Sequence, residues 1–405
     1  MSSSGAALTL AGLRDQLPIT RHVAYLQTGG HSPTPESVLR TVHDEMAREA
    51  EFHGVPAVAA ERAGKEARAR AALATMLRVR PDELGITPST SQAMLRVLHS
   101  LHWREGDEFV ITNLEHVSVA RNAWALRDQR GVRTKVVPAD CGDTVLLERL
   151  AATLTERTKL LCISHLASPD GRLLPVAEAA ALARERGVPV VVDAAQSLGQ
   201  FPVDVPSLGC DFLVGSGHKW LLGPMGVGFV WVAPHQLPTF LPTLLSDADP
   251  WAPPGTAAPP PSAARRAEGG THNAALIIGL GRAVENLAAI GLDTIAAHTQ
   301  RLTTLFREQV AGLARVHLLT PTAPGQSAGI TTLTFDGYDA TALRGLVGYI
   351  YEQHRTIVKF QWLTAPMDPS KLGMRVSIAG FNNEGEVRGL VTALQEGVPR
   401  FGAAD

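Results

Sequence analysis

The chain has 405 residues, of which 45% are apolar and 19% charged, and its 37 basic side chains nearly balance 39 acidic ones. A net charge of −2 provides no general field for nucleic acid or an acidic membrane surface. The longest apolar stretches, residues 188–192 and 226–232, are far too short to span a bilayer. We therefore expect a globular protein with a large core, whose partners include neither nucleic acid nor a membrane.

Three cysteines, Cys141, Cys162 and Cys210, are too few and too scattered for a disulfide framework or a metal cluster. Small buried core positions are the simplest interpretation of all three. The first ten residues also lack the basic start of a secretory signal. These features favour a reducing cytoplasm and predict no metal site.

In chain order, residues 1–24 are expected to form an N-terminal arm, and residues 36–77 are expected to be helical because they are rich in Ala, Arg and Glu. From residue 81 onwards, short β-branched runs alternate with helical patterns. The predicted strands are 109–112, 134–137, 160–164, 188–192, 212–214 and 227–232, and the predicted helices are 92–101, 118–129, 145–153 and 176–185. This alternation predicts an α/β fold with a mostly parallel sheet and helices on both faces.

The proline-rich residues 250–261 are expected to form an extended surface loop. Beyond them, helical and apolar segments indicate a smaller C-terminal α+β domain. We place the boundary near residue 290, which gives a large domain over residues 25–290 and a small domain over residues 291–405.

The segment over residues 190–232 is the most informative for chemistry. A buried strand ends there in Asp193, and a second strand is followed by the turn G-S-G-H-K, which ends in Lys219. Ligands bind at the carboxyl ends of parallel strands, and the glycines would let the backbone approach an anion closely. A lysine held there can be desolvated enough to act as a nucleophile. Taken singly, Asp193 is better explained as a helix cap and Lys219 as a surface residue.

An aspartate and a lysine at one sheet edge, with small polar groups between them, suit pyridoxal 5′-phosphate. This cofactor needs an amine for a Schiff base, a carboxylate opposite its ring nitrogen and donors for a dianionic phosphate. The S-T-S triplet at residues 89–91, at the start of a predicted helix, offers hydroxyls and free amides to such an anion. The same triplet is also an ordinary helix cap.

The sequence D-A-A-Q-S, followed by S-G-H-K-W-L-x-G-P-x-G-V-G, resembles the cofactor segment of the class V aminotransferase family. That family is a branch of the fold-type I pyridoxal phosphate enzymes and includes cysteine desulfurases, cystine lyases and isopenicillin N epimerase. The resemblance extends from Y-L-Q-T-G-G to the C-terminal domain. It implies a fold-type I transferase fold and dependence on pyridoxal 5′-phosphate.

The resemblance also implies a role for each matching residue. Lys219 would bind the cofactor covalently and then move the substrate α-proton, and Asp193 would pair with the ring nitrogen. Gln196 would reach the phenolic oxygen, and His116, in N-L-E-H-V-S-V, would stack over the ring. The residues that would hold the phosphate are Thr90, Ser91, Ser216 and His218, with Thr271, in G-G-T-H-N, reaching the phosphate of the partner subunit. The last match implies a homodimer with shared active sites.

Arg375, in M-R-V-S, matches the arginine that binds the α-carboxylate of an amino-acid substrate in this family. A planar guanidinium suits that task better than lysine. The resemblance also implies that the T-G-G turn contributes Gly29 and Gly30 to substrate binding. The alternatives from the residues alone are a strand ion pair for Arg375 and a structural histidine for His116.

The sequence departs from the desulfurase branch in two places. Desulfurases use a nucleophilic thiol shortly before the substrate arginine, whereas residues 356–374 contain no cysteine. A persulfide-forming desulfurase is therefore not expected. Ser168 stands where desulfurases usually carry asparagine, so the hydrogen bonding around the ring oxygen is expected to differ.

The resemblance and the missing thiol favour β-elimination of a carbon–sulfur bond in a cysteine-derived amino acid. Epimerisation of the isopenicillin N epimerase type is the second hypothesis and transamination the third, because each reaction would use the same Lys219 and Asp193. A catalytically silent scaffold is the non-enzymatic alternative. The joint presence of Lys219, Asp193, His116 and Arg375 argues against it.

Overall fold

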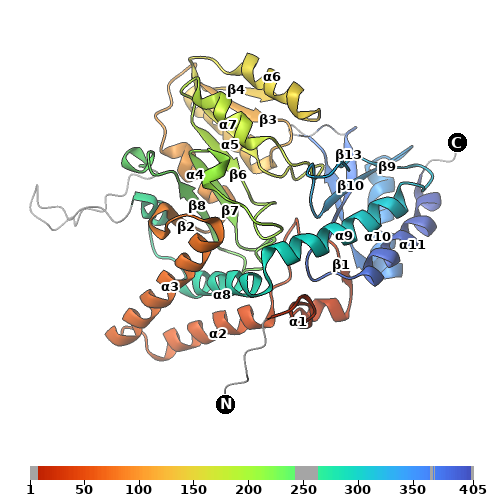
Figure 1. Cartoon of the computed structure of the whole chain (residues 1–405), viewed down its shortest axis with the longest axis horizontal. Helices are drawn as coiled ribbons and strands as arrows, with labels where there is room; N and C mark the ends of the chain where they lie inside the picture. The colour runs from red at the N-terminus through yellow and green to blue at the C-terminus, as the bar shows by residue number, and fades with distance from the viewer. Residues whose placement is uncertain (1–7, 242–262, 365–367, 369, 403–405) are drawn as a thin grey trace, which may run out of the picture.

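The computed structural model describes residues 8–241, 263–364, 368 and 370–402 (Figure 1). Its main feature is a seven-stranded sheet with the strand order β2-β8-β7-β6-β5-β3-β4. All neighbouring strands from β7 to β4 are parallel, and β8 is antiparallel to both β2 and β7. The strands are β2 (Leu84–Thr87), β3 (Glu108–Thr112), β4 (Arg133–Val137), β5 (Thr158–Ser164), β6 (Val190–Asp193), β7 (Phe212–Ser216) and β8 (Gly228–Val232). The expected mostly parallel sheet is confirmed.

Helices cover both faces of this sheet, because its central strands are buried at every position. In β6, Val191 packs in a core with α4 and α5, whereas Val190 and Val192 pack in a core that includes α3, α6, α7 and α8. Strands buried on both faces need continuous apolar sequence, which explains the V-V-V run. The helices are α2 (Glu36–Glu51), α3 (Pro56–Leu77), α4 (Thr90–His99), α5 (Val117–Arg130), α6 (Asp143–Thr153), α7 (Val176–Arg184) and α8 (Ala274–Ile290).

A four-stranded antiparallel sheet with the order β12-β13-β10-β9 forms the centre of the C-terminal part, on the right of Figure 1. Its elements are α9 (Leu292–Val310), β9 (Val316–Leu318), β10 (Ile330–Phe335), α10 (Ala340–His354), β11 (Thr356–Ile357), β12 (Lys359–Trp362), β13 (Leu372–Ser377) and α11 (Glu384–Phe401). One face of this sheet packs with α9, α10 and α11 in a core of its own. The other face carries polar residues toward the large sheet.

The N-terminal residues are packed against the rest of the protein where the structure describes them. Helix α1 (Leu10–Asp15) buries Leu13, and Arg14 pairs with Glu386 of α11 at 2.9 Å. Strand β1 (Ala24–Tyr25) pairs with β11. Residues 8–24 are therefore not a loose arm, although the division into an arm and two domains stays a prediction. The loop expected over 250–261 lies outside the described residues.

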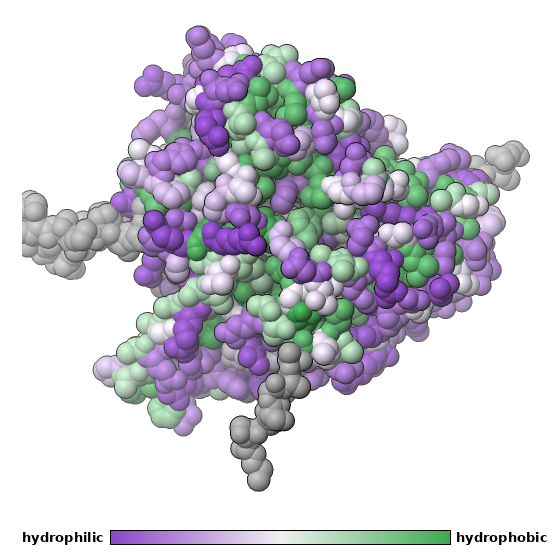
Figure 2. All heavy atoms as spheres, viewed as in Figure 1, coloured by the Kyte–Doolittle hydropathy of each residue, from purple (hydrophilic) through white to green (hydrophobic). Residues whose placement is uncertain are grey.

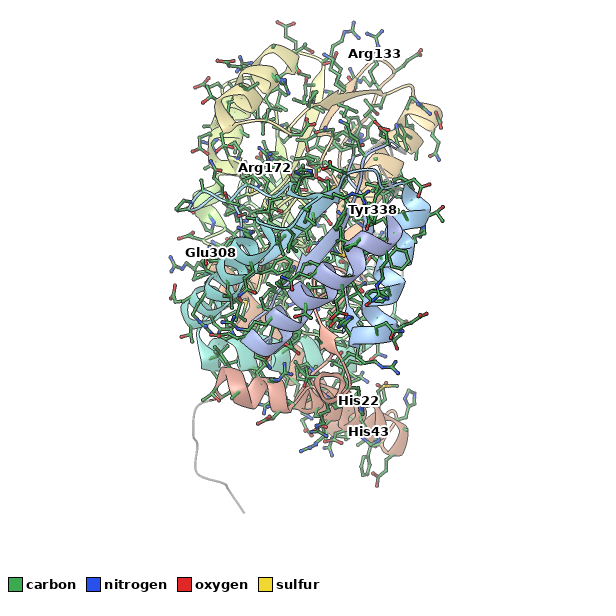
Figure 3. The ribbon with its side chains drawn as sticks, turned by 90° about the vertical axis from the view of Figure 1, so that its right-hand side faces the viewer. His22, His43, Arg133, Arg172, Glu308 and Tyr338 are labelled. Carbon is green, nitrogen blue, oxygen red and sulfur yellow. The ribbon has the colours of Figure 1, made fainter. Side chains whose placement is uncertain are left out.

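Short 3₁₀ helices connect several elements: η1 (Pro18–Arg21), η2 (Pro81–Glu83), η3 (Pro206–Leu208), η4 (Leu237–Thr239) and η5 (Ala263–Glu268). On the face in Figure 2, hydrophilic residues predominate at the periphery and hydrophobic ones are more frequent toward the middle. In the side view, Arg133 of β4 lies near one end of the molecule and His43 of α2 near the other (Figure 3). Within the described ranges, no single helix is long and apolar enough to cross a membrane. The pair α8–α9, bent by 76°, reaches the required length and apolar composition only when its two helices are taken together.

Candidate active site

Asp193 and Lys219 come together because β6 and β7 are parallel neighbours. Asp193 ends β6, opposite Val214 of β7, and Lys219 follows β7 in the next turn. Burial lowers the pKa of Lys219 to about 8, against the opposing effect of the Asp193 charge. Burial likewise raises the pKa of Asp193, which is only 7% exposed, while the Lys219 charge acts in the opposite direction. A lysine amine with this pKa is partly unprotonated near neutral pH and can act as a nucleophile or base.

The N-terminus of α4 lies beside this sheet edge and offers groups for an anion. Ser89 caps the helix, since its hydroxyl accepts a hydrogen bond from the Gln92 amide at 3.2 Å. Ser91 is exposed on the first turn. The Thr90 hydroxyl is buried and has no partner among the described atoms. Free amides and an unpartnered hydroxyl at a helix start are suited to binding a phosphate.

Ser216 ends β7 and His218 lies in the turn that follows, on the same edge of the sheet. The Ser216 hydroxyl and His218 Nδ1 are 3.1 Å apart, and burial, followed by the Lys219 charge, lowers the pKa of His218 to about 4. Gly228 makes this arrangement possible, because a Cβ there would lie 2.6 Å from the Ser89 backbone. The start of β8 and the start of α4 therefore approach closely, which brings the two predicted phosphate-binding groups to one edge.

Gln196 fixes the T-G-G turn to the large sheet. Its amide Nε2 donates to the Gly29 carbonyl at 2.9 Å, and its Oε1 accepts from Trp220 Nε1 at 2.9 Å. The Gly30 amide donates to the Gln27 carbonyl at 2.8 Å and so closes the turn. Gly29 thus lies at the site, whereas Gly30 serves the turn itself. Contact of either glycine with a substrate, and of Gln196 with a phenolic oxygen, stays a prediction.

His116 caps α5 at the opposite side of the site. Its Nδ1 accepts a hydrogen bond from the Ser118 amide at 3.3 Å. The side chain is exposed as a whole, but desolvation of the ring, followed by the charges of Lys219, Lys359 and Arg375, lowers its pKa to about 3. A neutral imidazole with one open side suits the predicted stacking on a ring.

Arg375 is the strongest candidate for binding a carboxylate. It is 0% exposed, and its Nη1 donates to the Ser168 hydroxyl at 2.7 Å. Its Nε and Nη2 are buried and have no partner among the described residues. Gly29 lies against the guanidinium, because a Cβ at that position would be 3.3 Å from Arg375 Cζ. Burial lowers the pKa of Arg375 to about 10, so it stays charged at neutral pH. Two unsatisfied donors on one guanidinium match a planar carboxylate.

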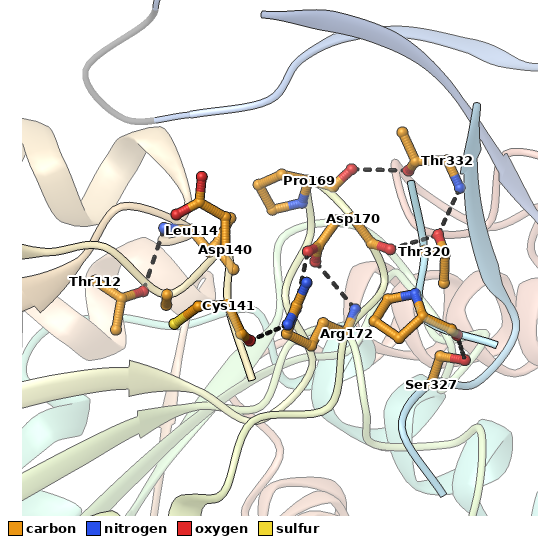
Figure 4. A network of polar contacts seen from close by, with 12 residues as sticks. Thr112, Leu114, Asp140, Cys141, Pro169, Asp170, Arg172, Thr320, Ser327 and Thr332 are labelled. Atoms are coloured by element: carbon orange, nitrogen blue, oxygen red, sulfur yellow. Dashed lines mark hydrogen bonds and ion pairs between the residues drawn. The ribbon is translucent and has the colours of Figure 1, made fainter. Parts of the chain in front are cut away.

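The loop after β5 forms hydrogen bonds with Arg375 and with other residues of the small sheet. Figure 4 shows the neighbouring contacts, in which Thr332 of β10 donates to the Pro169 carbonyl at 2.7 Å and Asp170 pairs with Arg172 at 3.1 Å. Gln361 of β12 donates to the Ser168 carbonyl at 2.8 Å. The serine that departs from the desulfurase pattern therefore orients the guanidinium of Arg375.

Thr271 makes no hydrogen bond with the other predicted site residues in the described part of the chain. It is exposed and lines a surface pocket of about 200 Å³ together with Thr87, Arg96 and Gly226. Its predicted contact with the phosphate of a partner subunit stays a prediction.

Sequence reasoning assigned no role to Glu115, although it stands directly before His116 in N-L-E-H. Glu115 is buried and accepts hydrogen bonds from the Ser164 amide at 2.9 Å, the Ser164 hydroxyl at 2.7 Å and the Thr112 hydroxyl at 2.8 Å. Burial raises its pKa to about 7, and the charge of Asp193 acts in the same direction. A second buried acid, in the connection between β3 and α5, therefore lies close enough to Asp193 for its charge to act on it.

The pKa of Glu115 predicts a pH-dependent stability. Since this pKa is above its ordinary value, the folded chain keeps a proton that the unfolded chain has lost, and stability falls as pH rises from 4.5 to about 7. Glu115→Gln is expected to remove this loss, so that its unfolding free energy relative to wild type rises by about 1–3 kcal/mol over that window. Urea unfolding of the cofactor-free protein measures this difference. The exposed Glu148→Gln is the control, and equal pH slopes for all three proteins would contradict the expectation.

Of the three thiols, that of Cys162 borders this group, with its Sγ 3.9 Å from Glu115 Oε2. Cys162 and Cys210 are buried, and burial raises the pKa of both thiols, that of Cys210 to about 12. Cys141 is half-buried, with its Sγ 3.7 Å from the Pro138 carbonyl. Among the residues that the structure describes, no group of three or more His, Cys, Asp or Glu side chains is arranged to hold a metal ion.

Known proteins resemble the chain in both sequence and structure. The probable cysteine desulfurase of Methanothermobacter thermautotrophicus is 30% identical over 304 residues, which cover 74% of this chain and 76% of the relative. The cysteine desulfurase of Salmonella newport is 32% identical over 305 residues, covering 72% and 71%.

Solved structures of such enzymes also resemble the fold of this chain. The cystine C–S lyase C-DES, in complex with its reaction product cysteine persulfide, superposes with a TM-score of 0.85 at 26% identity, covering 96% of this chain and 100% of the lyase. The apo cysteine desulfurase of Thermococcus onnurineus shares the fold, with a TM-score of 0.84 at 24% identity, covering 98% and 100%. The model of the family described as aminotransferase class-V matches residues 24–388. The chain therefore belongs to the aminotransferase class-V family.

Proposed function

We propose that the protein binds pyridoxal 5′-phosphate and catalyses β-elimination of a carbon–sulfur bond in a cysteine-derived α-amino acid. Family membership and the relatives named for desulfurase and C–S lyase activity support this proposal. The cofactor is supported further by a C-DES variant structure, 25% identical, that contains glycine covalently linked to pyridoxal phosphate.

The residues of this chain fit the cofactor. Lys219 supplies an amine with a lowered pKa, and Asp193 supplies a buried carboxylate beside it. The unpartnered Thr90 hydroxyl, with Ser216 and His218, provides groups for the phosphate. When bound, pyridoxal phosphate links covalently to an amine and withdraws electrons from the substrate Cα.

The chain's own residues would then perform the elimination as follows. Arg375 binds the α-carboxylate through its two unpartnered donors and thereby orients the Cα–H bond. Unprotonated Lys219 Nζ removes the α-proton, the Cβ–S bond breaks, and the sulfur leaves as a thiolate with the bonding electrons. A Cα=Cβ double bond forms, and the released 2-aminoacrylate reacts with water to give pyruvate and ammonia.

The absence of a suitable thiol is the observation that favours elimination over a desulfurase reaction. Residues 356–374 contain no cysteine, and Cys162 and Cys210 are buried with raised thiol pKa values. Thiolate is the nucleophilic form, so burial makes both cysteines inert. Without a thiol in the segment before Arg375 to accept sulfur, the substrate sulfur leaves with its own fragment.

We also propose that the protein is a homodimer of the cytoplasm. The exposed Thr271 and its pocket support a partner subunit that completes the phosphate site, and three free cysteines suit a reducing compartment. Sedimentation velocity at the mass of two chains tests the dimer.

Proton NMR in heavy water tests the reaction. Cofactor-loaded protein is incubated with L-cystine, S-substituted L-cysteines and a panel of other L-amino acids. Pyruvate formed from the sulfur amino acids supports the proposal. Loss of the α-proton signal without pyruvate would replace elimination with epimerisation or exchange, which chiral analysis separates. No change with any amino acid would support the silent scaffold.

A further inference from the structure

Two cations lie side by side on the small sheet. Lys359 of β12 and Arg375 of β13 are direct partners in an antiparallel pair. Directly opposed side chains leave such a pair on the same face, where like charges destabilise the sheet. Arg375 is fully buried, and its charge adds to the effect of burial in lowering the pKa of Lys359 to about 8. Since two opposed cations destabilise a sheet, a functional role would explain why both are present here.

The shared face is the one that looks onto the candidate active site. The alternate residues of β12 and β13 pack in the core of the small sheet: Phe360, Trp362, Met374 and Val376. Lys359, Gln361 and Arg375 therefore lie on the opposite face, where the last two bond to Ser168. The charge of Lys219 acts on Lys359, and that of Lys359 acts on His116. Direct pairing with Arg375 on this face places Lys359 close to the candidate site, and the charge effects agree with that position.

Nothing in the described part of the chain neutralises Lys359. Its side chain makes no hydrogen bond or ion pair with the residues that the structure describes. The charges that act on Lys359 are those of Arg375 and Lys219, which are both cations, whereas the carboxylate of Asp193 acts on Lys219. The Gln361 Oε1 beside it is also buried and without a partner in the described residues. One α-carboxylate would satisfy Arg375 and leave Lys359 still unpaired.

We propose that Lys359 binds a second acidic group of the substrate, a carboxylate carried by the sulfur fragment that leaves. The inference rests on the proposed elimination and narrows its substrates to S-substituted cysteines with an acidic S-substituent. Lys359 is in this sense a specificity-determining residue. It acts on the leaving fragment, whereas Arg375 acts on the α-carboxylate common to all amino acids.

Two substrates that differ only in this charge test the inference: S-carboxymethyl-L-cysteine and its neutral amide, S-carbamoylmethyl-L-cysteine. The cofactor-loaded wild type is expected to favour the acid, measured as the ratio of kcat/KM values for pyruvate release. Lys359→Met is expected to lower that ratio by about 10- to 100-fold, as for the loss of one charged hydrogen bond. Lys359→Arg is expected to retain most of it. The exposed Lys159→Met, on β5, is the matched control.

Calorimetric binding of the same two compounds separates the inference from the reaction on which it rests. Equal kcat/KM for acid and amide in the wild type, or an unchanged ratio in Lys359→Met, overturns the role of Lys359 and leaves elimination intact. Binding that depends on both the acidic group and Lys359, without pyruvate release, supports the role of Lys359 and overturns elimination.

Discussion

Lys219→Ala is expected to lower pyruvate release by at least about 10³-fold, because the variant lacks the amine that removes the α-proton. Lys219 lies in the turn after β7, beside Asp193, and burial lowers its pKa to about 8. Its removal relieves an unfavourable buried charge, so the fold should survive. The variant should also lose the covalent attachment of the cofactor, which borohydride reduction followed by mass spectrometry of the intact chain detects.

The matched control is Lys159→Ala, which removes an exposed lysine from β5. It should react with the cofactor at Lys219 and release pyruvate at the wild-type rate. Wild-type pyruvate release by Lys219→Ala would contradict the proposed reaction and every alternative that uses this lysine. Unfolding of the variant in urea at the wild-type midpoint shows that a lost rate reflects lost chemistry rather than a lost fold.

The large sheet was predictable because its strands are buried on both faces. Residues 190–192 pack alternately into the cores on the two faces of the sheet, so all of them must be apolar. The resulting unbroken apolar run can be recognised in the sequence. β2 (Leu84–Thr87) was not predicted, because it is only four residues long and includes a glycine. It joins the sheet by pairing with β8, which is distant in the sequence. The helix at 92–101 was predicted two residues late, because Ser89 rather than the apolar pattern sets its start.

Site residues could be predicted where they belong to one continuous sequence motif. They could not be predicted where their proximity depends on the pairing register of two strands. Asp193 and Lys219 lie in one continuous segment, and parallel pairing of its two strands brings them together. Lys359 and Arg375 are opposed only through the β12–β13 register, which no local pattern encodes. Ser168 was noticed as a departure, but its bond to Arg375 joins residues 207 positions apart. Such a contact follows from the packing of two sheets.

Asp193→Asn is expected to lower kcat by about 10²-fold while leaving the fold intact. Asparagine has nearly the same shape, and its side-chain oxygen can still accept the Ala195 amide hydrogen bond of 2.9 Å. It carries no negative charge, so it would no longer hold a proton on the ring nitrogen of the cofactor. Losing one charged hydrogen bond in a buried site has an effect of about this size. Steady-state pyruvate release gives kcat, and urea unfolding of the cofactor-free protein gives stability.

Asp211→Asn is the matched control, since Asp211 precedes the neighbouring strand β7 and has a purely structural environment. Its carboxylate accepts hydrogen bonds from the Val190 amide at 2.8 Å and from Gln236 at 2.9 Å. This variant should lose stability and keep its kcat, the reverse of Asp193→Asn. Burial raises the pKa of Asp193, so its charge costs folding free energy, and Asp193→Asn should match or exceed the wild type in stability. If Asp193→Asn instead unfolds early and keeps its kcat, Asp193 serves the sheet, and the carboxylate beside Lys219 has no part in the chemistry.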